Sequence, residues 1–452
     1  YDRGPLRMSF PRYSRYRSSG VEWLGEIPEH WGVQRLKRIG SVLPSNVDKK
    51  MHSGEMPIRL CNYTDVYYNE RITDEIDFME ATASSEQVAK FALRAGDTVI
   101  TKDSETADDI AVGAYVPSDL PGVVCGYHLA VVRPLPGTHG AFIKRLFDSS
   151  YAKRMVAVRA NGLTRVGLGK FDLDNLPLPF PPQAEQERLV AFIDSETSKI
   201  EDLVKEQRRL MELLNEKREA VIATAVIRGL NPDAAMKSSG VEWLGDVPSH
   251  WQVCRLGNVF REVAEAGTDD LPILSVSIHD GVSDKEIDEE DMDRKVSRSE
   301  DRSKYKRVAP GDLVYNMMRA WQGGFGTVAV RGMVSPAYVV ARPTRPLETA
   351  YIEHLLRTPQ AIEQMRRHSR GVTDFRLRLY WDEFKNIRVA LPPRAEAIAI
   401  CVKLAEMEQR FSAMSEACAE SIALLQERRV ELISAAVTGQ IDVRGIAVPG
   451  SV

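Results

Sequence analysis

Apolar residues recur every seven positions in one stretch of the chain, and this pattern predicts a long helix packed against a partner helix. Two prolines, Pro181 and Pro182, precede the stretch and favour a helix that begins directly after them. Gly229 and Pro232 are typical of residues that end a helix. The predicted a positions are Ile193, Ile200, Gln207, Leu214 and Val221, and the d positions are Glu196, Leu203, Leu210 and Lys217.

The same register returns 211 residues later, after a second pair of prolines, and predicts a second long helix. Acidic and basic residues are interspersed over the rest of the first helix, which is typical of a solvated face. We therefore expect helices over residues 183–230 and 392–440. The a positions of the second helix are Leu404, Phe411, Cys418, Leu425 and Leu432, and its d positions are Met407, Met414, Ser421 and Arg428.

The segments in front of the two helices have a different pattern. Short β-like runs such as DTVIT and HLAVVRP alternate with glycine, proline, asparagine and aspartate in residues 40–180, and residues 257–391 have the same character. Residues 141–158 carry apolar side chains at helical spacing, with basic residues on the opposite face. The expected fold class is α+β, with two mixed α/β globular domains and two long helices.

A block of sequence near the start of the chain returns in front of the second α/β segment. Residues 18–36 read SSGVEWLGEIPEHWGVQRL and residues 238–256 read SSGVEWLGDVPSHWQVCRL, so fourteen of nineteen positions are identical. An internal repeat of this length sets the architecture. The α/β segments share only scattered marks, such as RAGDTVI at 94–100 and APGDLVY at 309–315. The chain is therefore predicted to be a duplicated frame that holds two different modules.

The composition is typical of a globular cytoplasmic protein. The 452 residues are 43% hydrophobic, which suffices for the cores of two or three domains, and no apolar run is long enough for a membrane span or a signal peptide. The five cysteines are scattered, and Cys125 and His128 have ligand-like spacing without a second pair, so we expect no zinc module. The formal net charge of −4 gives no bulk signal of nucleic-acid binding.

The sequence lacks the motifs of several enzyme classes. GLTRVGLGK at 162–170 is unlike a phosphate-binding loop, because Leu168 stands where that motif has lysine. We find no Asn/Asp-Pro-Pro-Tyr/Phe methylase signature and no nuclease motif of paired carboxylates with a lysine. We therefore expect a protein that is not itself an enzyme.

Several motifs follow one another in a fixed order over nearly the whole chain. VEWLGEIPEHW opens the first module and its variant opens the second, LPLPFPPQAEQERL and VALPPRAEAIAI close them, and AAVTGQIDVR lies near the C-terminus. Together they resemble the specificity subunit of type I restriction-modification systems. One departure is that the second closing segment, PPRAEAIAI, lacks the EQ of the first.

This resemblance implies two target recognition domains, each reading one half of a bipartite asymmetric site in double-stranded DNA. It also implies that the long helices form an antiparallel coiled coil and dock two modification (methyltransferase) subunits, with restriction subunits in the full complex. The chain would be non-catalytic and would hold no cofactor itself. Adenine N6 methylation would use S-adenosylmethionine in the modification subunits, while ATP and magnesium would belong to the restriction subunits.

The length of the heptad pattern predicts the distance between the two half-sites. At 1.5 Å per residue the heptads from 193 to 221 span roughly 42 Å, or about 12 base pairs. Half-sites about one DNA turn apart are therefore expected.

The predicted segments are an N-terminal tail over 1–17, in which Met8 is a candidate natural start, recognition domains over 18–182 and 231–391, spacer helices over 183–230 and 392–440, and a C-terminal tail over 441–452. These boundaries follow from the repeat, the prolines and the heptads.

Basic clusters and loop residues supply the candidate DNA contacts. Lysine and arginine outnumber acids in residues 144–170, 294–307 and 366–378, so these clusters either neutralise phosphates or form solvated helix faces. Base readout needs donors and acceptors on loops or strand ends. Three glycines in residues 316–326 permit a sharp loop that presents Trp321, unless that ring packs in the core. The candidates are Lys102, Ser104, Asn161, Thr164, Arg165 and Lys170 in the first module, and Arg319, Trp321, Gln322, Arg370, Thr373, Arg376, Arg378 and Tyr380 in the second.

A duplicated frame keeps what must be the same at both ends, so we expect specificity where the two copies differ. The repeated tryptophans and several heptad residues are instead candidates for contacts with the frame or with partner subunits. These residues are Trp23, Trp31, Trp243, Trp251, Leu203, Leu210, Leu214, Phe411, Met414 and Leu425.

Three functions remain open from the sequence. The first is DNA recognition, either in a type I restriction-modification complex or in a modification-only methyltransferase complex. The second is a stand-alone nuclease or methylase with an unrecognised site. The third is a coiled-coil scaffold that binds only proteins, for which the basic clusters would be incidental.

Overall fold

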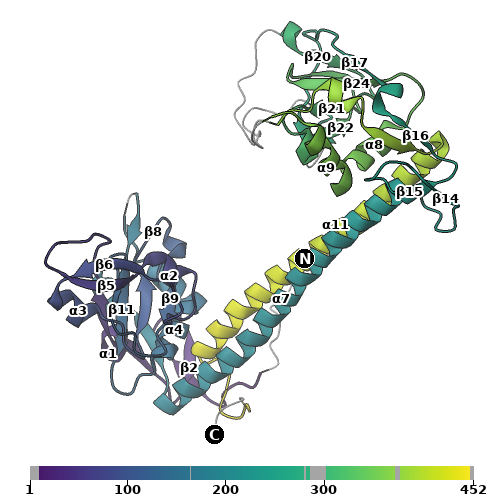
Figure 1. Cartoon of the computed structure of the whole chain (residues 1–452). Helices are drawn as coiled ribbons and strands as arrows, with labels where there is room; N and C mark the ends of the chain where they lie inside the picture. Colours follow the sequence, from purple (N-terminus) through teal and green to yellow (C-terminus); the bar gives the residue numbers. More distant parts are fainter. Residues whose placement is uncertain (1–9, 163, 279–280, 286–301, 372–376, 448–452) are drawn as a thin grey trace. The chain divides into compact units, whose positions relative to one another are not determined.

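The computed structural model describes residues 10–162, 164–278, 281–285, 302–371 and 377–447. It divides into two compact units, Tyr1–Gln207 with Ala419–Val452 and Arg208–Cys418. Each unit contains one α/β module and a part of each long helix (Figure 1). The expected class of two mixed α/β domains with two long helices is confirmed.

The two long helices begin where the prolines predict. Helix α7 covers Gln183–Arg228 with 46 residues, and α11 covers Arg394–Val437 with 44 residues. A glycine with left-handed φ follows each of them, Gly229 at +77° and Gly439 at +79°, which is a usual way to end a helix. In each unit the first turns of one helix share a hydrophobic cluster with the last turns of the other, so the two helices pack antiparallel.

The heptad pattern is correct for most of the apolar a positions of this helix pair, but the prediction that the d positions pack against the partner helix is wrong for three apolar residues. At the d positions, Leu203, Leu210 and Met414 are 52%, 42% and 48% exposed, so these side chains are open to a partner instead of packed in the frame. Phe411 and Leu425 are half-buried. The buried a positions are Ile193, Ile200, Leu214, Leu404, Cys418 and Leu432.

A four-stranded sheet in the order β4-β11-β7-β9 forms the centre of the first unit. Val99 and Val131 face one hydrophobic cluster and Ile100 and Val132 face another, because successive strand residues point to opposite faces. A three-stranded sheet, β10-β5-β6, covers the first cluster, and α4, α5 and α7 cover the second. The strands are β1 (Tyr16–Ser18), β2 (Glu26–Pro28), β3 (Gly32–Arg35), β4 (Gly40–Pro44), β5 (Met56–Cys61), β6 (Met79–Ala83), β7 (Thr98–Thr101), β8 (Asp103–Ser104), β9 (Gly113–Tyr115), β10 (Val123–Cys125), β11 (Leu129–Pro134), β12 (Val166–Gly167) and β13 (Pro177–Phe180). The helices are α1 (Leu36–Ile39), α2 (Tyr63–Tyr67), α3 (Ser85–Phe91), η1 (Ala107–Asp109), α4 (Gly140–Asp148), α5 (Ser150–Ala157) and α6 (Lys170–Asp174).

The second unit repeats this plan with a four-stranded sheet in the order β17-β24-β21-β22. Two-stranded sheets flank it, β14-β15, β16-β25, β18-β19 and β20-β23. The strands are β14 (Met236–Ser238), β15 (Asp246–Pro248), β16 (Gln252–Arg255), β17 (Phe260–Val263), β18 (Val276–Ser277), β19 (Gly281–Val282), β20 (Lys306–Val308), β21 (Leu313–Asn316), β22 (Phe325–Thr327), β23 (Gly332–Val334), β24 (Tyr338–Pro343) and β25 (Arg388–Leu391). The helices are η2 (Leu256–Asn258), η4 (Arg302–Lys304), η5 (Ala320–Gln322), α8 (Thr349–Leu356), α9 (Pro359–His368) and α10 (Trp381–Phe384).

The Gly-Asp mark shared by the two modules is a buried ion pair. Asp97 is fully buried and accepts two hydrogen bonds from Arg133, at 2.9 and 2.8 Å. Asp312 is 2% exposed and accepts two from Arg342, both at 2.9 Å. Each aspartate precedes a central strand and each arginine lies on the neighbouring strand. The two modules therefore have the same sheet despite their different sequences.

Each copy of the repeated block packs against the start of one long helix and the end of the other. Trp31 is 1% exposed, and its Nε1 donates to Oε1 of Glu185 in the first turn of α7 at 3.1 Å. A Cβ on Gly439, just beyond α11, would lie 3.2 Å from the Trp31 ring. In the second unit the fully buried Trp251 lies against Gly229, just beyond α7. These two tryptophans are part of the frame, as proposed from the repeat.

The first tryptophan of each block lies in a different environment. Trp23 is 51% exposed. Trp243 is half-buried and packs against the core of the second unit. Trp23 is therefore available to a partner, whereas Trp243 contributes to the frame.

The N-terminal segment that the structure describes is not a loose tail. Phe10 packs edge-on against an aromatic ring of α7 with centroids 5.1 Å apart, and Tyr13 is 5% exposed and hydrogen-bonded to Glu185. Beyond α11, Ile441 and Val443 are buried as well. The prediction of an N-terminal tail is wrong for these packed residues, and the predicted C-terminal tail contributes buried side chains as well. Their few apolar side chains show no periodicity, but long-range packing gives each of them a place in the core.

Candidate nucleic-acid interface

Two loops of the first module meet at one end of its central sheet, where β8 lies in Figure 1. Strand β8 follows the central strand β7, and β12 precedes the closing strand β13. Val166 and Gly167 pair with Ser104 and Asp103 in antiparallel register. From the sequence, the two segments were separate candidates for DNA contacts. The structure brings them together on one surface.

The side chains of these loops differ in their access to a ligand. Ser104 is only 6% exposed, so its prediction as a DNA contact is wrong: pairing of β8 with β12 turns it inward. Lys102 forms an ion pair with Asp103, with Nζ 2.7 Å from Oδ2. The exposed candidates of the second loop are Asn161, Thr164, Arg165 and Lys170, of which Asn161 donates to the Arg159 carbonyl at 2.8 Å and Lys170 pairs with Asp174 at 2.8 Å.

Aromatic residues that the sequence analysis missed lie beside these loops. Tyr63 and Tyr67 of α2 stack with ring centroids 5.4 Å apart and an interplanar angle of 18°. The hydroxyl of Tyr67 donates to Asp109 at 2.9 Å, and this hydrogen bond raises the pKa of Tyr67. Tyr127 and His128 lie in the loop between β10 and β11, with ring centroids 4.6 Å apart. The tyrosines spaced four apart directly after a buried strand were the available signal.

The second module builds the same junction from different residues. The N–H of Leu379 donates to the carbonyl of Met317 at 2.9 Å, as the N–H of Leu168 donates to Lys102 at 2.8 Å in the first module. Both leucines are buried beneath the junction. An antiparallel bridge between Arg370 and Arg378 matches the bridge between Asn161 and Gly167 in the first module. The backbone arrangement is thus shared, and the side chains above it differ.

The glycine-rich loop of the second module is sharp, as predicted. Gly323 has a φ of +87°, and a Cβ on Gly324 would lie 3.0 Å from the carbonyl oxygen of Arg319. Trp321 is half-buried, and its Nε1 donates to Met318 at 3.0 Å, so this ring does not belong to the core. Arg319 is half-buried, and Gln322 is exposed.

The closing loop of the second module contributes the remaining candidates. Arg378 is exposed, and Tyr380 is 41% exposed, while the intervening Leu379 is buried, so successive side chains point to opposite faces. Arg370 is exposed and forms an ion pair with Glu383. Two further candidates, Thr373 and Arg376, lie outside the described residues.

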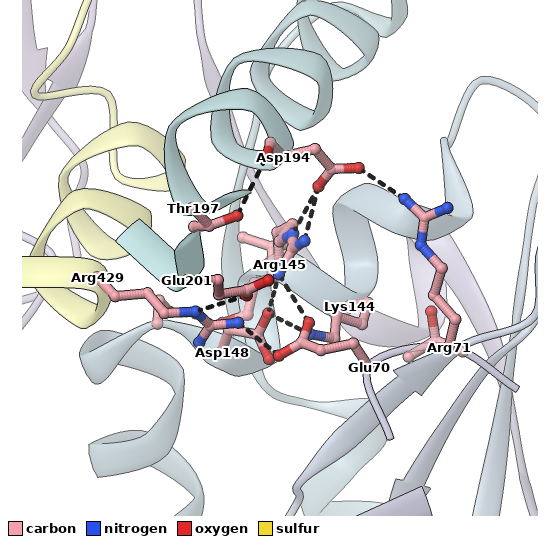
Figure 2. Close-up of polar contacts among 12 residues, drawn as sticks. Glu70, Arg71, Lys144, Arg145, Asp148, Asp194, Thr197, Glu201 and Arg429 are labelled. Carbon is pink, nitrogen blue, oxygen red and sulfur yellow. Dashed lines mark hydrogen bonds and ion pairs between the residues drawn. The ribbon is translucent and has the colours of Figure 1, made fainter. Parts of the chain in front are cut away.

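The basic residues at the start of the first cluster serve the fold. Figure 2 shows Lys144 and Arg145 surrounded by carboxylates: Arg145 lies 2.6 Å from Asp194 of α7, and both basic residues pair with Glu70. Arg429 of α11 also pairs with Glu70. Burial alone would raise the pKa of the Glu70 carboxyl, but Lys144, Arg429 and Arg145 lower it to about 2. The network joins the module to both long helices, so the prediction that this part of the cluster neutralises phosphates is wrong.

The described residues contain no group of three or more His, Cys, Asp or Glu side chains that could hold a metal ion. Cys125 is fully buried, and burial raises the pKa of its thiol and of the neighbouring Cys61 thiol. Among the helices that the structure describes, none has the length and apolar character of a membrane span.

Comparison with known proteins identifies the fold. The chain matches the HsdS subunit of Thermoanaerobacter tengcongensis with a TM-score of 0.53 and 18% identity, covering 92% of this chain and 98% of that one. A chain from a structural study of the assembly and conformational transition of the type I R-M system matches with a TM-score of 0.62 and 17% identity, covering 93% and 99%. A type I restriction enzyme specificity subunit of Methanocaldococcus jannaschii, MjaX, is 22% identical over 241 residues, which are 52% of this chain. The matched region spans about half of that relative, 54% of its length. No protein-family model matches the chain.

Proposed function

We propose that this chain, which has the fold of HsdS specificity subunits, reads a bipartite DNA site for a type I restriction-modification complex. The observation that carries the proposal is that the two-loop junction occurs in both modules with the same backbone arrangement. Each junction presents different side chains, with Asn161 and Arg165 in one module and Arg319, Gln322 and Arg378 in the other. Two unlike surfaces on a duplicated frame suit two unlike half-sites.

The exposed side chains of the junctions have the chemistry of base readout. Arginine can donate two hydrogen bonds to guanine, and asparagine or glutamine can form two with adenine. The buried leucine beneath each junction, Leu168 or Leu379, holds the loop backbone in place. A rigid backbone lets the side chains alone decide which bases are read.

The partners follow from the same proposal. Methyl transfer with S-adenosylmethionine would take place in modification subunits, and this chain would supply the sequence choice. Leu203, Leu210, Met414 and Trp23 leave apolar surface exposed on the helices and on the repeated block, which suits docking of those subunits. DNA recognition in a modification-only complex would use the same surfaces.

The test is to express the chain with its modification subunits and to sequence the methylated bases of host DNA with this gene present and absent. We expect one bipartite motif that appears only with the gene, and a mobility shift that prefers this motif. Binding without any sequence preference would favour a scaffold instead. Methylation or cleavage by the purified chain alone would show that it is an enzyme.

A further inference from the structure

A third loop of the first module approaches the junction and contributes aromatic side chains. Tyr127 and His128 follow Gly126, whose N–H donates to the carbonyl of Cys61 at 2.9 Å. A Cβ at Gly126 would lie only 2.8 Å from that oxygen, so glycine is needed for the close approach. The contact brings this loop beside the residues that follow Cys61, where Tyr63 begins α2.

Together with Asp48 and Lys49, the two segments line a small cavity of about 140 Å³. Its aromatic walls can make apolar contact with the methyl group of thymine, which is accessible in the major groove of double-stranded DNA. Its polar groups can donate to or accept from the edge of a base. Tyr127 is 51% exposed, so the cavity is open to a large ligand. The lining residues are Asp48, Lys49, Asn62, Tyr63, Gly126, Tyr127 and His128.

The charge of Asp103 beside the cavity is balanced within the protein. Oδ2 of Asp103 lies 2.7 Å from Nζ of Lys102 and 3.0 Å from Nδ1 of His128. Nζ of Lys102 also lies 4.8 Å from the centre of the Tyr127 ring. With Asp103 paired in this way, its charge does not oppose the approach of phosphates. The same pairing orients the imidazole, and Nε2 of His128 has no hydrogen-bond partner among the described residues.

Backbone hydrogen bonds join this loop to the junction. The N–H of Lys102 donates to the carbonyl of His128 at 3.0 Å, and the carbonyl of Lys102 accepts from Leu168 at 2.8 Å. The side chain of Tyr63 is also close to Ser104 and Arg165, which influence its pKa, although burial is the main cause of its rise. The cavity and the junction are therefore adjacent.

We propose that Tyr63, Tyr127, His128, Lys102 and Asp103, here called the Tyr127 site, read bases of the first half-site in double-stranded DNA. His128 Nε2 contacts a base edge, Tyr127 packs against a thymine methyl group, and Lys102 and Asp103 position both rings. This inference rests on the proposed function and assigns specificity to Tyr63, Tyr127 and His128, which the sequence did not identify as DNA contacts.

The test uses the complete chain with its modification subunits, the methylated motif in host DNA, and the affinity of the purified complex for DNA. His128→Asn and Tyr127→Leu each alter a partly exposed side chain, so both variants should fold. We expect each to lower discrimination at one or two positions of the first half-site by about 5- to 150-fold and to leave the second half-site unchanged. Lys90→Met on α3, which does not line the cavity, is the matched control and should keep both half-sites.

Three other outcomes of this experiment are possible, and each would contradict the inference. An unchanged first half-site in both variants would show that these side chains do not read bases. Equal weakening at every sequence would mark a phosphate contact instead. If the unaltered complex shows no bipartite motif, the proposed function itself fails, and this outcome is seen in the wild type before any variant is compared.

Discussion

Arg370 and Asn161 occupy matching places in the two modules, because each pairs its backbone with the loop that precedes the closing strand. The residue that follows this pairing is a buried leucine in both modules, Leu379 or Leu168. An exposed side chain can therefore change from one module to the other without disturbing the junction. At this scale, the shared residues serve the fold and the unlike residues are the candidates for recognition.

Arg378 provides a direct test of this division. We expect Arg378→Ala to relax one position of the second half-site by about 1–3 kcal/mol, since a bidentate contact to guanine would be lost. The methylated motif of the assembled complex reports the change. Arg331→Ala, at an exposed arginine outside the three basic clusters, is the control. Loss of discrimination in the first half-site would contradict the assignment.

Glu70 predicts a pH dependence of stability in the first unit. Its pKa is lowered from 4.5 to about 2 in the folded state, so the stabilisation is fully present above about pH 4.5 and is lost as the pH falls toward 2. The side chain is 47% exposed, so after screening we expect about 1 kcal/mol at neutral pH. Thermal unfolding of Glu70→Gln should differ from wild type at pH 7 and converge with it near pH 2. Glu75→Gln, an exposed carboxylate, should show no such difference, and a gap that widens in acid would contradict the prediction.

At the scale of elements, each long helix ends against the repeated block. The two glycines that end them have the same backbone conformation but different surroundings. A Cβ on Gly439 would lie 2.3 Å from Cδ of Pro28, whereas a Cβ on Gly229 would meet its nearest atom, on Glu396, at 3.2 Å. The end of α11, at Gly439, therefore has less space for a side chain than the end of α7, at Gly229.

We expect Gly439→Ala to lower the free energy of unfolding by about 2–3 kcal/mol, because left-handed φ and overpacking against Pro28 both disfavour alanine. Gly137→Ala is the matched control, since Gly137 has a φ of +83° and open space around its Cα, and should cost about 1 kcal/mol. Denaturant unfolding measures both. Equal costs would show that the contact with Pro28 is relieved by movement.

At the scale of the whole molecule, α7 and α11 each pass through both compact units. An insertion of one heptad into each helix, near Gln207 and Cys418, keeps the apolar register. We expect the unread spacer of the DNA motif to lengthen by about 3 base pairs, since seven helical residues span roughly 10 Å. Sequencing of methylated bases gives the spacer. Altered half-site bases at an unchanged spacer would contradict the prediction.

Much of the candidate site could not be predicted from the sequence, because it depends on contacts between segments that are far apart in the chain. Lys144 and Arg145 look like a basic patch with one acidic neighbour, Asp148, but two further carboxylate partners come from Glu70 and Asp194, far away in the chain. Ser104 is polar in a loop, yet strand pairing buries it. Burial and ion pairing depend on contacts between distant segments, which periodicity and local composition do not report.

The sequence by itself determined the frame: a duplication, two long helices and their starting points. These rest on local signals, because prolines stop a helix where they stand and heptads reflect the period of the helix itself. Only the tertiary structure decided which side chains share a surface. The Tyr127 site combines residues that follow β5, β7 and β10. These strands belong to two sheets, and strand pairing between distant parts of the chain is what brings the segments after them together.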